Sequence, residues 1–273
     1  MIKPLVIPAA DLENALGDNL SDLDNDLGIS FPDANDFITE DDTPVDNIAS
    51  EKQQRLLTAV LYSNLTDQRF LAAANVGIYH TVNQPAIVPD VFVSFNVEVP
   101  EDFWPKENRC YFLWNFGKPP DIAIEVVSNR VGNELTHKFK LYEQMRVSYY
   151  VVFDPMKRLG GDRLGIFELR GLQYQKMQCQ ENGDFWLGQV NLGLTLWDGE
   201  FEGGSGPWLR WCDAQGQLLP TGDEQAHAAQ AEAKQAKEQA RNAQEQAAQA
   251  QAQAQRLADF LRSQGIDPDQ LPG

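Results

Sequence analysis

The sequence predicts an α/β (α+β) domain with a mixed central sheet, followed by a long Ala/Gln-rich helix. Residues 119–155 have the pattern of a strand, a turn, an amphipathic helix and a second strand. A connection of this length joins neighbouring parallel strands through a right-handed crossover. Later apolar runs are separated by tight turns, which indicates antiparallel strands in the same domain.

Glu125 breaks the pattern of its strand. Residues 121–128 are mostly β-branched and apolar, and alternate side chains point to opposite faces of a sheet. Glu125 therefore shares a face with Ala123 and Val127 in the most apolar surroundings of the chain. After it, 129–133 supplies a turn before the helix.

Lys138 breaks the pattern of the helix expected at 134–145. The apolar stripe of this helix has three–four–three spacing and consists of Leu135, Lys138, Tyr142 and Met145. His137 and Lys140 point away from it. Because an unpaired charge is costly to bury, we expect Lys138 and Glu125 to meet each other, or a metal ion and water, at the strand ends. A purely structural ion pair, with Lys138 reaching towards solvent, is the alternative.

The chain has 273 residues, enough for one sizeable domain with appendages. We expect an acidic, flexible arm at 1–45, a central domain at 46–220 and a helical tail at 221–273. The arm is rich in Asp, Asn and Pro, and contains at most a short helix near 11–20. A helix over 223–264 would extend ~60 Å. Its alanine-rich face predicts either a weak coiled coil that forms a homo-oligomer or a solvated spacer.

Membrane and extracellular classes are not indicated. No apolar run approaches membrane-spanning length, and the first residues lack the basic-then-apolar layout of a signal peptide. The three cysteines are widely spaced, so neither a disulfide framework nor a zinc site is predicted. We expect a cytoplasmic protein.

The net charge of -18 is unevenly distributed. Residues 1–50 hold 12 Asp and Glu against Lys3 alone, which is -11, and 221–273 hold 8 acidic and 5 basic residues, which is -3. Residues 51–220 hold 20 acidic and 16 basic residues, which is -4. The domain is not basic, so an enzyme acting on nucleic acid would have to concentrate positive charge locally.

A helix is expected over 48–65. Ser50-Glu51-Lys52-Gln53 has the spacing of a capping box, and an apolar band follows it. Glu51 lies in the first turn, where a carboxylate interacts favourably with the helix dipole.

Two strands are expected at 70–82 and 86–95, separated by a turn at 83–85. Val88-Pro89-Asp90 places a lone carboxylate at the mouth of the second strand, although an Asp after Pro is also common in turns. The remaining predictions are an aromatic loop at 98–118, short strands at 165–169, 173–178 and 184–189, and a closing hairpin at 208–213 and 217–219.

Four motifs together resemble the bacterial Uma-two family, restriction endonuclease-like proteins of the PD-(D/E)XK nuclease superfamily. The resemblance covers about 48–219, and an Ala/Gln-rich helix followed by Gly-Ile-Asp-Pro at 265–268 is similar to tails appended to such domains. The motifs are Val88-Pro89-Asp90, Pro120-Asp121-Ile-Ala-Ile-Glu125-Val-Val-Ser128, Lys138-Phe-Lys-Leu-Tyr142 and Tyr149-Tyr150-Val-Val-Phe-Asp154-Pro155.

The resemblance implies a site for a divalent metal ion. Asp90 and Glu125 would supply hard oxygen ligands suited to Mg²⁺ or Mn²⁺, and the backbone carbonyl of Val126 would be a further ligand.

It also implies that Lys138 is the catalytic lysine. The usual lysine of the superfamily follows the acidic residue by two positions, where this chain has Val127, and Lys138 on the next helix takes its place. Glu51 is a weaker match to an acidic residue that some members contribute from the first helix.

The function expected from this resemblance is Mg²⁺-dependent endonuclease hydrolysis of DNA. RNA is another phosphodiester of the same class. The alternative is a catalytically silent nuclease fold that acts as a scaffold through its C-terminal helix. The acidic balance of the domain favours the scaffold, whereas the presence of Asp90, Glu125 and Lys138 favours the enzyme.

Overall fold

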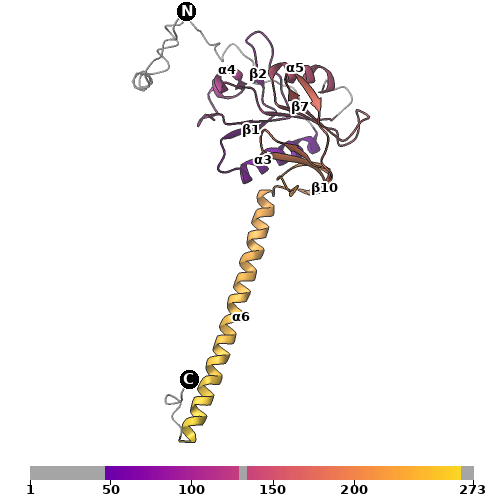
Figure 1. Cartoon of the computed structure of the whole chain (residues 1–273). Coiled ribbons are helices and arrows are strands. Elements are labelled where there is room, and N and C mark those ends of the chain that lie inside the picture. Colours follow the sequence, from indigo (N-terminus) through magenta and orange to yellow (C-terminus); the bar gives the residue numbers. More distant parts are fainter. Residues whose placement is uncertain (1–46, 129–133, 266–273) are drawn as a thin grey trace, which may run out of the picture. The chain divides into compact units, whose positions relative to one another are not determined.

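The computed structural model describes residues 47–128 and 134–265 (Figure 1). The arm at 1–45 and the turn at 129–133 lie outside these residues. The chain divides into two compact units, Met1–Leu218 and Leu219–Gly273.

The first unit is built on a mixed six-stranded sheet with the strand order β1-β3-β5-β6-β7-β8. Strands β5 and β6 are parallel, with Glu125 opposite Val152, and the other neighbours are antiparallel. The predicted strand–helix–strand unit is therefore the centre of the sheet. The strands are β1 Phe70–Ala74, β3 Val91–Phe95, β5 Ile122–Val126, β6 Tyr149–Phe153, β7 Leu164–Arg170 and β8 Gln173–Lys176.

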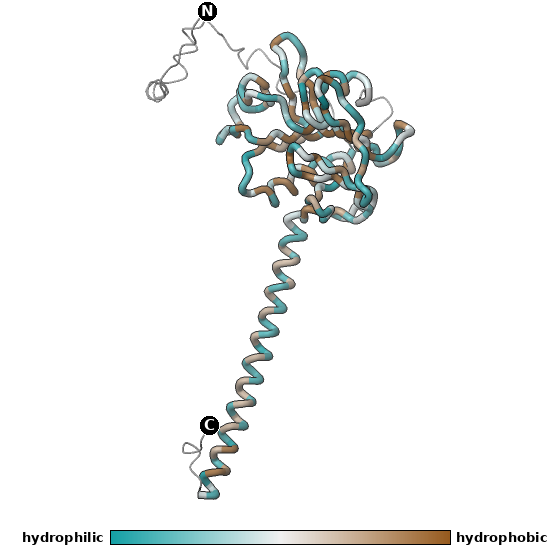
Figure 2. The backbone as a smooth tube through the Cα atoms, viewed as in Figure 1, coloured by the Kyte–Doolittle hydropathy of each residue, from teal (hydrophilic) through white to brown (hydrophobic). Residues whose placement is uncertain are grey.

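Helices cover both faces of this sheet, and Figure 1 shows α5 (Phe139–Met145) and α3 (Ile48–Asn64) on opposite sides of it. Tyr142 and Met145 of α5 are buried in an apolar cluster that includes Ala123. Helix α3 packs against β1, β3 and the second sheet. Figure 2 shows apolar residues concentrated on the strands between these layers.

The second sheet is antiparallel and has the order β11-β10-β9. Its strands are β9 Phe185–Leu187, β10 Leu192–Phe201 and β11 Gly204–Cys212. The smaller elements are β2 Ile78–Tyr79, η2 Lys106–Asn108, β4 Tyr111–Phe112 and α4 Leu113–Phe116.

The Gln53 side chain joins α3 to β11. Its amide nitrogen donates to the carbonyl of Leu209 at 2.8 Å, and its amide oxygen accepts from the Leu209 N–H at 2.9 Å. The glutamine therefore pairs with one residue of the strand as a neighbouring strand would.

Two strand predictions around the start of β3 are wrong in extent. The strand expected over 70–82 stops at Ala74, because Asn75 adopts a φ of 55°, outside the extended region. The strand expected over 86–95 is confined to Val91–Phe95, and Ile87 forms only an isolated bridge with Ile78. The loop expected at 98–118 contains η2, β4 and α4.

Two other sequence predictions are also wrong. The N-cap of α3 is Asn47, whose side chain accepts from the Ser50 N–H, so Ser50 does not begin a capping box. The hairpin expected from 208–213 and 217–219 is reduced to a bridge between Cys212 and Leu218, since β11 pairs along its length with β10.

The second unit contains α6, Gly222–Ser263, which begins at a capping box formed by Thr221 and Glu224. None of its side chains is buried, and Leu257 and Phe260 are each 60% exposed. In the part of the chain that the structure describes, no helix is both long and apolar enough to cross a membrane.

Candidate active site

Asp90 lies immediately before β3, where the chain enters the sheet beside the C-terminal end of β5. Its Oδ2 atom accepts a hydrogen bond of 2.5 Å from the Val126 N–H. This bond holds the Asp90 carboxylate against the peptide that follows Glu125, so the carboxylate that precedes β3 and the one on β5 lie at the same end of the sheet.

Glu125 lies on the face of β5 covered by α5, and only 1% of the residue is exposed. Its Oε2 atom accepts from Lys138 Nζ at 2.7 Å, and Oε1 accepts from the Tyr142 hydroxyl at 2.8 Å. Lys138 and Tyr142 are one helical turn apart, so α5 and the turn before it supply both donors.

Lys138 ends a single π-helical turn, η3 Glu134–Lys138, that leads into α5. Such turns are frequent at functional sites. The Lys138 side chain is 27% exposed, and its ammonium also donates to the Val88 carbonyl at 3.2 Å. The ammonium therefore bridges Glu125 and the segment that carries Asp90, whereas His137 and Lys140 are exposed, as predicted.

Burial raises the pKa of Glu125 to about 8, and the negative charge of Asp90 adds to the rise. The Lys138 ammonium and the Tyr142 hydroxyl act in the opposite direction, because both favour the ionised carboxylate. A metal cation beside Glu125 would lower the pKa of this carboxyl group again. Binding of a cation would therefore favour release of the Glu125 proton.

Gln54 of α3 reaches Asp90 from another side of the site. It is 3% exposed, and its Nε2 atom lies 3.5 Å from Asp90 Oδ1. Asn75 Nδ2 donates to Gln54 Oε1 at 2.9 Å, and the Asn75 N–H donates to the Asp90 carbonyl at 3.2 Å. Residues from α3, the end of β1, β5 and α5 thus converge around two carboxylates.

The donor chemistry fits a hard divalent cation. Asp90 and Glu125 offer carboxylate oxygens, and the peptide carbonyl of Val126 follows directly at the end of β5. Within 47–128 and 134–265, no group of three or more His, Cys, Asp and Glu side chains could hold a metal ion. A cation held here would therefore complete its shell with water or substrate oxygens, as Mg²⁺ commonly does.

Glu51 does not belong to the group of residues around Asp90 and Glu125. It is exposed, and it binds Arg55, whose guanidinium also pairs with Glu202. These ion pairs lower the pKa of Glu51 and of Glu202. The α3 residue that contacts Asp90 is Gln54, one turn later.

The sequence interpretation therefore missed Gln54, Asn75 and Tyr142 as members of the site. Gln54 had a visible signal, because it is a polar residue on the apolar band of α3, on the same face as Leu57 and Leu61. Tyr142 was assigned to the buried stripe without a role. Asn75 had no signal, since its place depends on a backbone turn within an expected strand.

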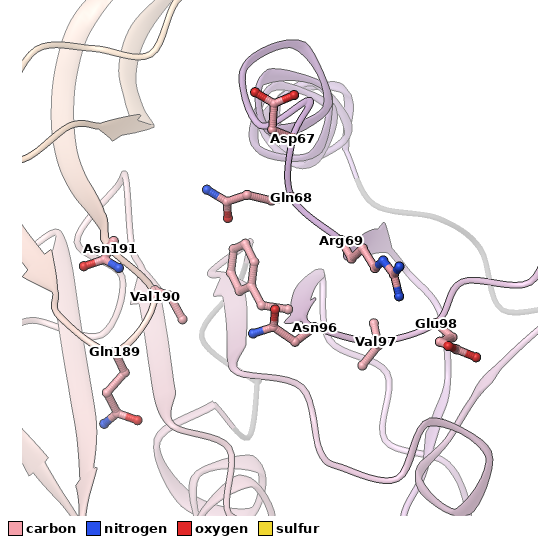
Figure 3. A pocket seen from close by; sticks show the side chains of 10 residues that line it. Asp67, Gln68, Arg69, Asn96, Val97, Glu98, Gln189, Val190 and Asn191 are labelled. Atoms are coloured by element: carbon pink, nitrogen blue, oxygen red, sulfur yellow. The ribbon is translucent and has the colours of Figure 1, made fainter. Parts of the chain in front are cut away.

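A cleft lies at the other ends of the strands, where β1 begins and β3 ends. Its volume is about 680 Å³, and Figure 3 shows its polar side chains, which are all exposed. It is lined by Asp67, Gln68, Arg69, Phe95, Asn96, Val97, Glu98, Gln189, Val190 and Asn191. Asp90, Glu125 and Lys138 are not among the residues that line this cleft.

Comparison with known proteins places the chain in a family. The model of the Uma2 family, described as "Putative restriction endonuclease", matches residues 34–197, more than half of the chain. No curated protein matches the chain. A crystal structure described as "a putative nuclease belonging to DUF820" from Anabaena variabilis is 18% identical, with 51% of this chain and 72% of that chain covered and a TM-score of 0.36. The family match includes α3, the whole six-stranded sheet, and the residues Asp90, Glu125 and Lys138. The chain therefore belongs to the Uma2 family.

Proposed function

We propose that this protein is a metal-dependent endonuclease that hydrolyses DNA phosphodiester bonds. The observation that carries the proposal is the convergence of Asp90, Glu125 and Lys138 at one end of the central sheet. The family to which the chain belongs supports the same chemistry. Nuclease catalysis depends on positioning and on stabilising charge, and these three side chains supply two oxygen ligands and one cation.

Asp90 and Glu125 would hold Mg²⁺ or Mn²⁺, with the Val126 carbonyl as a further ligand. When bound, the metal would polarise the phosphodiester and acidify a water molecule. Val126 and Tyr142 orient the two carboxylates by donating to one oxygen of each. The second oxygen of Asp90, Oδ1, faces Gln54, and the second oxygen of Glu125, Oε2, accepts from Lys138.

Lys138 is the proposed catalytic cation. Its ammonium is partly desolvated and lies 2.7 Å from Glu125. When a metal ion holds Glu125, the same ammonium would orient the attacking water or stabilise negative charge that develops on the phosphate. Its second contact, with the Val88 carbonyl at 3.2 Å, helps to keep the ammonium at the site.

Incubation of the purified full chain with supercoiled plasmid, single-stranded DNA and RNA tests this proposal. We expect cleavage of DNA with Mg²⁺ or Mn²⁺ and no cleavage with chelator. Cleavage of RNA alone would assign the same site to a different nucleic acid. No cleavage of any of the three, by protein that binds Mn²⁺, would overturn the nuclease function.

One observation favours a second function, a nuclease fold used as a scaffold through its C-terminal helix. Helix α6 carries apolar residues at uninterrupted three–four spacing, the heptad pattern of a coiled coil. These positions are Ala226, Ala229, Ala233, Ala236, Ala240, Ala243, Ala247, Ala250, Ala254, Leu257 and Leu261. We call this row of residues the coiled-coil seam. Since no α6 side chain is buried, the seam is available for a second copy of the chain, and we propose homo-oligomerisation through it.

A further inference from the structure

We propose that Gln54 and Asn75 form a two-amide relay that positions the Asp90 carboxylate for metal binding. The inference rests on the proposed function, because it concerns the same metal site. It assigns positioning roles to two uncharged amide side chains, which act through their hydrogen bonds.

The first step of the relay is the contact between Gln54 and Asp90. Gln54 is buried within α3, and its Nε2 atom lies 3.5 Å from Asp90 Oδ1, at the long end of hydrogen bonding. The Val126 N–H binds the other oxygen, Oδ2. With a donor at each oxygen, rotation of the carboxylate about its terminal bond is restricted, and its remaining lone pairs have a defined direction.

The second step is the contact between Asn75 and Gln54. A glutamine amide can present either its oxygen or its nitrogen to a neighbour. Asn75 Nδ2 donates to Gln54 Oε1 at 2.9 Å, so the Gln54 oxygen is used by Asn75 and the nitrogen is turned towards Asp90. Without Asn75, the Gln54 amide could turn its oxygen towards the carboxylate, where the two would repel.

The backbone at Asn75 sets this arrangement. Asn75 has a φ of 55°, a left-handed conformation that Asn tolerates better than most residues. Its N–H donates to the Asp90 carbonyl at 3.2 Å. Asn75 therefore fixes the Asp90 backbone directly and the Asp90 side chain through Gln54.

A neutral donor suits this position for an electrostatic reason. An amide orients Asp90 without neutralising it, so the carboxylate keeps its full charge for a cation. A lysine at the same place would compete with the metal ion, and a carboxylate would repel Asp90. Residues that orient metal ligands in this way typically change metal affinity or activity about 10–100-fold when they are removed.

The neighbouring glutamine provides a matched control. Gln53 is 1% exposed and also makes two contacts through its amide, but its partner is Leu209 of β11. Gln53→Met and Gln54→Met remove the same chemical group from adjacent buried positions of one helix. Both are expected to destabilise the fold, and only Gln54→Met removes a contact to Asp90.

The experiment is titration of the full chain with Mn²⁺ by calorimetry, well below the melting temperature of each variant. We expect Gln54→Met to weaken Mn²⁺ binding about tenfold and Gln53→Met to leave it unchanged. Asn75→Gly keeps the positive φ and the N–H but removes the side-chain donor, so it should weaken binding as well. Combined with Gln54→Met it should add little, because both changes break one relay.

Unchanged Mn²⁺ affinity in folded Gln54→Met would overturn the inference, as would equal losses in Gln53→Met and Gln54→Met. Wild-type protein that binds Mn²⁺ but cleaves no nucleic acid would refute the proposed function and leave the relay supported or refuted by the same titrations. Wild-type protein that binds no Mn²⁺ would refute both.

Discussion

Glu125 has a buried carboxylate with two donors from one helix. The Lys138 ammonium and the Tyr142 hydroxyl each bind one of its oxygens, and the 2.7 Å contact to Lys138 is an ion pair in which the glutamate side chain is 2% exposed. A structural ion pair and a catalytic pair both require this contact. The two roles differ in the effect of removing the charge of Glu125 or of Lys138, because a structural pair affects stability and a catalytic pair affects cleavage.

The raised pKa of Glu125 makes a prediction about stability and pH. Because burial raises the pKa from 4.5 to about 8, the folded protein holds a proton that the unfolded chain releases. The resulting stabilisation is fully present below about 4.5 and is lost as the pH rises through 8. Between pH 5 and 8, we expect wild type to lose on the order of 2–4 kcal/mol more of its free energy of unfolding than Glu125→Gln.

Urea denaturation of both proteins across this range measures the difference. Added Mg²⁺ at pH 8 should stabilise wild type and not the variant, because the proposed site binds the cation through the ionised carboxylate of Glu125. Parallel pH profiles for the two proteins would show that Glu125 is ionised in the folded state at all these values.

The charged residues of the site could be predicted from the sequence, and its neutral residues could not. Glu125 and Lys138 stand out because each interrupts an apolar pattern, and burial of opposite charges requires that they meet. Gln54 and Asn75 carry no charge to be compensated. Their roles depend on the direction of two amides and on one backbone angle, which no local pattern encodes.

At the scale of elements, local periodicity predicted β5, α5 and β6 because each has a continuous pattern of its own. Strand β10 was not predicted, since its second half alternates between half-buried and exposed residues and owes its strand conformation to pairing with β11. The two strands turn at Glu202 and Gly203, which have φ values of 46° and 77°. Long-range pairing of this kind is decided by the partner strand.

Helix α6 gives a prediction about assembly. A chain truncated after Pro220 is expected to stay folded, because no α6 side chain is buried, and to sediment as a smaller species than the full chain. Analytical ultracentrifugation compares the two. Aggregation or unfolding of the truncated chain would show that α6 belongs to the fold of the domain.

A pair of point variants separates the coiled-coil seam from the rest of α6. Ala240→Glu places a charge at a heptad position of the seam, whereas Ala231→Glu makes the same change outside it. Only the first should reduce self-association. Equal effects of the two variants would count against the heptad interface.

At the scale of the whole molecule, the distribution of charge opposes the binding of a polyanion. Residues 1–50 carry -11 of the total of -18, and 51–220 carry -4. If the chain binds DNA as proposed, the phosphate contacts come from a few local cations such as Lys138, and the acidic residues of 1–45 compete with DNA for these cations.

Deletion of the acidic arm, residues 1–45, is expected to tighten DNA binding. The gain should be largest at low salt, where screening is weakest, and should shrink as ionic strength rises towards 0.15 M. Fluorescence anisotropy with a labelled oligonucleotide in the presence of Ca²⁺ measures it. Equal affinity of the two chains at low ionic strength would remove the proposed role of the arm.

The most direct test of the proposed metal-dependent site compares Lys138, at the end of η3, with Lys140 of α5. Lys138→Met removes the ammonium that contacts Glu125, and Lys140→Met removes an exposed ammonium two residues away. With plasmid DNA and Mn²⁺, we expect Lys138→Met to lose cleavage while it still binds Mn²⁺, and Lys140→Met to cleave like wild type. Full cleavage by Lys138→Met, or equal losses in the two variants, would contradict the assignment of Lys138 and with it the proposed active site.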